Sequence, residues 1–161
     1  MASKEIWTDE QTYEDYQAAE HFLGFTYDPK DASEIVDRMR AAPVVYHYGA
    51  DALRVAGLPV LGESNVHVVR VLDEYYRGKL LTPVLIVRGS GGGRLFFAVA
   101  DGYYRICAGV YLDELVKVPC RMVPKEAPKP QPAPEPAEVQ ADTAPVDGPP
   151  RRTPAAPRIY G

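Results

Sequence analysis

The order of short apolar runs between Leu81 and Val123 constrains the fold of this chain more than any other feature. Pro83–Arg88 is an almost continuous apolar run, and Leu95–Ala100 is a second one after a glycine-rich link. Such runs predict two paired strands, the first covered on both faces. An Asp101-Gly102 turn, a helix-like stretch and a further apolar run complete the segment. This order predicts a helix that begins at the end of a small mixed sheet.

The link from Gly89 to Gly93 has two interpretations. Glycine-rich loops can cradle phosphates, but those loops continue into a Lys-Ser/Thr pair and a helix. Here the link continues into a strand. A flexible hairpin turn is therefore the favoured interpretation.

Helices are expected before this segment. Thr8 with Gln11, and Asp31 with Glu34, have capping-box spacing, which predicts acidic helices over 9–23 and 31–42. A short strand is expected over 44–48, and a short helix over 50–56 that Gly57 stops.

A further helix is expected over 65–77, with Ser64 as its N-cap and Gly78 just after its end. One of its stripes is expected to pack, and a second stripe is free for other roles. The packing stripe contains Val66, Val69, Asp73 and Tyr76, and the second contains His67, Arg70 and Glu74.

Length and charge indicate one folded domain with a tail. A chain of 161 residues with 46% hydrophobic content can build one ordinary core. The net charge of -4 combines an acidic part, residues 1–37, with a moderately basic part, residues 38–123. After Val123 the chain is rich in proline, which predicts a disordered or polyproline-like tail over 124–161. The basic balance fits a local phosphate pocket better than a surface that follows DNA.

Several classes of protein are not indicated. Cys107 and Cys120 form no CxxC pair, and the three histidines at 21, 47 and 67 lack the local spacing of a metal site. The first residues lack the apolar core of a signal peptide, and no run is long enough for a membrane span. We therefore expect a cytoplasmic protein without a structural metal and without a membrane partner.

The turn from Asp101 to Arg105 is the strongest candidate for a binding site. Amide groups at the start of a helix lack intrahelical partners, and the helix dipole is positive there. Gly102 would let a ligand approach the main chain, and Arg105 would add a guanidinium suited to phosphate oxygens. The alternative is that Asp-Gly is an ordinary strand-to-helix connection, that Arg105 pairs with a nearby acid, and that Tyr103 and Tyr104 are packing aromatics.

The same residues carry a resemblance to the ParB/sulfiredoxin superfamily. A strand, a Gly-(Glu or Cys)-(Arg or His)-Arg turn and a helix are typical of that family, and 81–87 and 118–123 resemble its flanking strands. The resemblance covers 58–123 and extends to uncharacterised bacterial proteins with a DGYHR turn. It implies an α+β fold of the ParB/sulfiredoxin type, preceded by a helical extension over 1–57.

The resemblance also implies roles for individual residues. Gly102 and Arg105 match positions that lie at a nucleotide's phosphates in the family. The place of Asp101 just before the helix, apart from the resemblance, suits a helix cap or a cation ligand. Tyr103 replaces the catalytic cysteine of sulfiredoxins or the glutamate of the ParB turn, and Tyr104 replaces a histidine or arginine. Cys107 lies one helical turn further on and is expected to pack. His67 and Arg70 are the expected nucleotide contacts from the preceding helix, or else part of a solvated helix face.

Two functions follow as hypotheses. The first is a domain that binds a nucleotide or another phosphate ligand, with ATP or CTP and Mg²⁺ as implied cofactors and phosphoryl transfer or nuclease activity as an open extension. The second is a non-catalytic protein-interaction module with a degenerate site. In either case the RxxPxxP spacing from Arg151 to Pro157 offers a contact for a protein partner, although a plain linker is favoured. DNA is a weakly supported partner because no helix-turn-helix region follows the fold.

Overall fold

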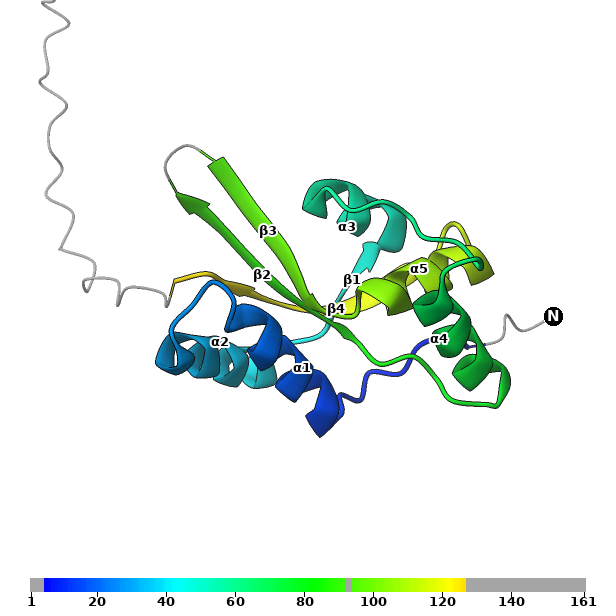
Figure 1. Ribbon diagram of the computed structural model, residues 1–161, viewed down its shortest axis with the longest axis horizontal. Helices are drawn as coiled ribbons and strands as arrows, with labels where there is room; N and C mark the ends of the chain where they lie inside the picture. Colours follow the sequence, from blue (N-terminus) through cyan, green and yellow to red (C-terminus); the bar gives the residue numbers. More distant parts are fainter. Residues whose placement is uncertain (1–4, 92–93, 127–161) are drawn as a thin grey trace, which may run out of the picture. The chain divides into compact units, whose positions relative to one another are not determined.

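A mixed sheet of four strands with five helices forms the part of the chain that the computed structural model describes, residues 5–91 and 94–126 (Figure 1). The elements in chain order are α1 (Tyr13–Leu23), α2 (Pro29–Ala41), β1 (Val45–Tyr48), α3 (Gly49–Ala56), α4 (Val66–Tyr76), β2 (Val84–Gly91), β3 (Arg94–Asp101), α5 (Tyr103–Leu112) and β4 (Lys117–Pro124). The predicted α+β class is confirmed, as are the strands and the helix expected between Leu81 and Val123.

The sheet has the order β1-β4-β2-β3, so the last strand in the sequence lies inside the sheet. β4 pairs antiparallel with β1 and parallel with β2, and β2 forms an antiparallel hairpin with β3. Parallel neighbours need a crossover connection. Here the chain from β3 to β4 passes through α5, which places the start of α5 at the end of β3.

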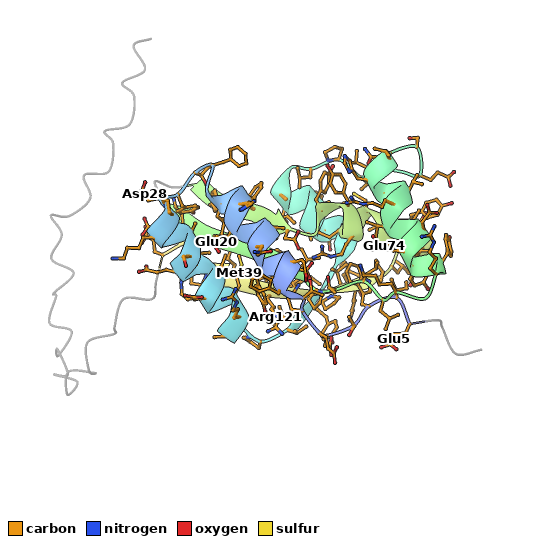
Figure 2. The ribbon with its side chains drawn as sticks, turned by 60° about the horizontal axis from the view of Figure 1, so that its bottom comes forward. Glu5, Glu20, Asp28, Met39, Glu74 and Arg121 are labelled. Atoms are coloured by element: carbon orange, nitrogen blue, oxygen red, sulfur yellow. The ribbon has the colours of Figure 1, made fainter. Side chains whose placement is uncertain are left out.

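Helices cover both faces of the sheet (Figure 1). Leu85 and Val87 of β2 belong to a cluster with buried residues of α1 and α2, including Met39, which Figure 2 labels. Val84 and Ile86 belong to the other cluster, together with residues of α3, α4 and α5. The four side chains from Val84 to Val87 are fully buried, as the continuous apolar run predicted.

The caps of the first two helices differ from the prediction. α1 begins after Thr12, whose hydroxyl accepts the Asp15 amide while the Asp15 carboxylate accepts the Thr12 amide. α2 begins after Asp28, with Pro29 in the first turn. Proline at this position has its φ already set for a helix and lacks only an amide hydrogen that would have no intrahelical partner. These local features outweigh the boxes expected at Thr8 and Asp31.

The packing stripe of α4 was also predicted wrongly. Its buried residues are Val68, Leu72 and Tyr75, whereas Val66 and Tyr76 are largely exposed. The N-cap is Asn65, which accepts two backbone amides, and not Ser64. The sequence VHVVRVLDEYY has apolar residues on several stripes, so periodicity alone did not identify the buried one.

The expected helical extension over 1–57 supplies β1 to the sheet and α1 to α3 to its two faces. It belongs to the same compact unit as the rest of the chain up to residue 127. The predicted tail lies outside the described residues from 127 onward, as do residues 92 and 93 of the predicted hairpin turn. None of the described helices has the length and apolar character that a membrane span requires.

Candidate functional site

The turn between β3 and α5 requires glycine at position 102. Its φ of 110° lies in the left-handed region, where side chains other than that of glycine are strained. A Cβ atom there would lie 2.9 Å from Cγ2 of Val84 and 3.0 Å from Nη2 of Arg105. The backbone therefore approaches both residues more closely than any other amino acid would allow.

α5 begins directly after this glycine without a side-chain cap. The first intrahelical bond that we identify runs from the Ile106 amide to the Gly102 carbonyl, at 2.9 Å. The amides of Tyr103, Tyr104 and Arg105 precede it and have no carbonyl within the helix to donate to. The helix thus begins at the turn that the sequence predicted, and the binding of an anion to its first amides stays a prediction.

Arg105 points into the protein. Its Nε donates to the Thr82 carbonyl at 3.1 Å, and Nη2 donates to the Pro83 carbonyl at 2.9 Å and to the Asp101 carboxylate at 2.8 Å. Nη1 forms an ion pair with Asp15 at 3.5 Å. To clamp a phosphate, as the sequence interpretation expects, this guanidinium would have to exchange protein partners for the ligand.

Asp15, Asp101 and Arg105 form a charge cluster in which all three side chains are at most 16% exposed. Burial alone would raise the pKa of Asp15, but the charge of Arg105 and hydrogen bonds, including one from Thr82, lower it below 3.8 overall. Burial raises the pKa of Asp101 above 3.8, and the nearby Asp15 carboxylate adds to this increase. One guanidinium thus serves two carboxylates, of which Asp101 holds a proton more readily.

A cavity of about 400 Å³ adjoins the turn, and we call it the β3 groove. Its lining is mostly apolar and aromatic and includes no Lys, Arg or His of the described residues. It comprises Phe22, Ala56, Leu58, Phe97, Ala98, Val99, Ala100, Asp101, Gly102, Tyr103 and Tyr104. The volume is within the range of small-molecule sites.

Aromatic side chains occupy the end of the β3 groove nearest to α5. The ring of Tyr104 stacks on His67 of α4 at 4.5 Å and lies 5.3 Å from the ring of Tyr103. The Tyr103 hydroxyl donates to the Pro59 carbonyl at 2.6 Å. His67 therefore contacts Tyr104 but does not itself line the groove.

Arg70 lies elsewhere. It contributes with Arg105, Asp15 and Glu74 to a second cavity of about 140 Å³, which we call the charged pocket. The seven predicted site residues are therefore divided between two cavities: Asp101 to Tyr104 line the β3 groove, with His67 behind Tyr104, whereas Arg70 and Arg105 line the charged pocket.

Cys107 is fully buried, and its Sγ accepts the Leu61 amide at 3.4 Å. Burial raises the pKa of this thiol, which lowers the fraction present as the nucleophilic thiolate. A packing role fits these observations.

The carboxylates at the turn are poorly suited to Mg²⁺. A magnesium site needs free carboxylate oxygens around an open position. Here Asp101 and Asp15 already share the positive charge of Arg105. Within residues 5–91 and 94–126, no group of three or more His, Cys, Asp or Glu side chains is arranged to hold a metal ion.

Sequence reasoning missed Asp15 and the groove walls formed by Phe22 and Leu58. Asp15 lies 90 positions before Arg105, and local spacing gives no sign that the two meet. The one available signal was the Thr12–Asp15 capping box, which would have placed Asp15 in the first turn of α1.

The comparisons with known proteins give no match: no family model matches the chain, and neither the curated proteins nor the solved structures include a significant relative. The structure itself defines the chain's class, an α+β unit with a four-stranded mixed sheet.

Proposed function

We propose that the chain is a ParB/sulfiredoxin-like binding domain that holds a nucleotide or another phosphate ligand at the start of α5. The observation that carries this proposal is the position of the β3 groove, whose lining includes Asp101, Gly102, Tyr103 and Tyr104. Backbone amides at the turn would receive the phosphate. The stacked rings of Tyr104 and His67 offer a surface for the base.

Binding is a better fit than hydrolysis. Tyr103 takes the position of the family's cysteine or glutamate, and the two nearest carboxylates are already engaged by Arg105. Phosphoryl transfer needs a positioned base or a metal ion in addition to phosphate donors. The groove lining also carries no cationic side chain, so a nucleoside monophosphate is as good a candidate ligand as ATP or CTP.

Titration with inorganic phosphate, AMP, ATP and CTP, followed by amide NMR, tests this proposal. We expect the amide signals of Tyr103, Tyr104 and Arg105 to shift with at least one nucleotide. Tyr104→Ala should weaken nucleotide binding about tenfold because it removes the stacking surface. Tyr111→Ala is the matched control, since it removes an exposed tyrosine from the other end of α5. No shift with any of the four compounds at about 10 mM would contradict the proposal.

A protein-interaction module is the second candidate. The bonds of Arg105 favour this candidate. Its guanidinium donates to two backbone carbonyls and a carboxylate of the same fold, so it stabilises the fold and is not free to bind a ligand.

A further inference from the structure

β3 ends the sheet, and one of its backbone edges lacks a strand partner in the described part of the chain. The β3 groove follows this edge, because its lining includes the five consecutive residues Phe97–Asp101. Successive side chains of a strand point to opposite faces, so a cavity over one face would contact every second residue. The lining includes Phe97 and Val99, which pack on the face of α3 to α5, and Ala100, which packs on the face of α1 and α2. Because both faces contribute, the groove lies beside the β3 backbone.

The walls of the groove come from both sides of the sheet. Phe22 belongs to α1, which packs on one face, while Ala56 and Leu58 belong to α3 and the segment after it, on the other face. Phe22 remains 45% exposed although it is a large apolar side chain. The walls therefore flank the unpaired edge of β3 from both faces of the sheet.

We propose that the β3 groove binds an extended peptide segment of a partner protein, which adds to β3 as a fifth strand. An open edge presents backbone donors and acceptors at the spacing that another strand satisfies. The apolar lining favours a peptide with apolar side chains, because Asp101, the one charged residue among the described lining residues, is already paired with Arg105. The alternate side chains of such a peptide would contact the walls on either side.

The pairing of β3 limits where the peptide binds. Ile86 pairs with Val99 and Leu85 with Asp101, so Ala100 is the additional residue of a bulge. Bulges interrupt regular pairing. The added strand would therefore pair with the regular part of β3 before Ala100. This inference goes beyond the proposed phosphate site and does not depend on an anion at α5.

Blocked heptapeptides provide the test. The probes are acetyl-Lys-X-Thr-X-Thr-X-Lys-amide peptides in which X is valine, leucine or phenylalanine, added to the full chain. We expect alternate amides of Phe96–Val99 to exchange with solvent about tenfold more slowly when a peptide is bound. Two N-methylated forms of the best peptide, modified at the X or at the Thr positions, serve as backbone controls. One should lose binding, because its amides face β3, and the other should retain it.

Phe22→Ala and Phe25→Ala form a matched pair. Both remove an exposed phenylalanine near the end of α1, but only Phe22 lines the groove. Phe22→Ala should weaken peptide binding about tenfold, and Phe25→Ala should change it less than twofold.

Three results would each overturn the inference: no binding by any peptide at about 1 mM, equal effects of the two N-methylations, or equal effects of the two variants. The phosphate proposal is tested separately, by the change in the amide NMR signals of Tyr103 and Tyr104 when a nucleotide is added. Either proposal can therefore fail while the other stands.

Discussion

The β3 groove and the charged pocket adjoin the same short segment, Asp101–Arg105, but differ in what they leave open. In the charged pocket, Arg105 is bonded to two carbonyls and two carboxylates. In the groove, the strand edge and the apolar walls have no comparable partners in the described part of the chain. The residues of one sequence motif can thus differ in whether the fold itself already uses them. Here Arg105, the most conspicuous residue of the predicted binding motif, is bonded within the protein.

The largest expected effect comes from Arg105→Ala, which tests the stabilising side of this comparison. The variant leaves Asp15 and Asp101 buried without their shared counter-charge, and we expect it to lower the free energy of unfolding by about 3 kcal/mol. Urea unfolding followed by circular dichroism measures the change. Arg70→Ala, an exposed residue of the same pocket, should change it by less than about 0.5 kcal/mol. Similar losses in the two variants would contradict a special role for Arg105.

The next effect concerns the turn that joins the two cavities. Gly102→Ala should lower the free energy of unfolding by about 2 kcal/mol, because both the positive φ and the contact with Val84 oppose a Cβ atom. Gly57→Ala is the control: its φ of 68° is also positive, but no atom lies within 4 Å of its added Cβ. It should cost about 1 kcal/mol. The difference between the two losses of unfolding free energy, measured by thermal or urea unfolding, gives the cost of the close contact with Val84 at Gly102.

A smaller effect is expected in the pH dependence of the free energy of unfolding, to which the two carboxylates of the charge cluster contribute with opposite sign. The pKa of Asp101 is raised in the folded state, so stability increases as the pH falls through that raised pKa towards 3.8. The pKa of Asp15 is lowered, so its contribution is complete above pH 3.8 and is lost as the pH falls through the folded-state pKa below that value.

Unfolding free energies of Asp15→Asn and Asp101→Asn across this pH range test the assignment. As the pH falls, Asp101→Asn should remove the increase in stability that occurs above pH 3.8. Asp15→Asn should remove the loss of stability that occurs below pH 3.8. Exchanged effects of the two variants would show that Asp15, and not Asp101, has the raised pKa.

The smallest effect is expected in the groove. Tyr103→Phe removes an exposed hydrogen bond to the Pro59 carbonyl, so we expect a loss of no more than about 0.5 kcal/mol. Differential scanning calorimetry is a suitable measurement. A loss as large as that of Arg105→Ala would show that the groove residues are as important for stability as those of the charged pocket.

The sequence predicted the elements near the turn well because their signals are local. The double-sided burial of Val84 to Val87 and the turn at Asp101-Gly102 before a helix both follow from short stretches of sequence. The buried stripe of α4 did not, because Val66, Val68 and Val69 are chemically equivalent until a tertiary partner selects one of them. Pairing of Arg105 with a nearby acid was one of the two interpretations of the sequence, and Asp101 is such an acid. Asp15 could not be predicted as a second partner, because it meets Arg105 only through the packing of α1.

The inner position of β4 has a consequence for how the chain is made. During synthesis, β1, β2 and β3 are translated before the strand that joins β1 to the hairpin exists. Until Lys117–Pro124 has been translated, β1 has no strand to pair with and the hairpin has a second open side. The nascent polypeptide therefore passes through a period in which its unfinished strands are exposed to chaperones and to neighbouring chains.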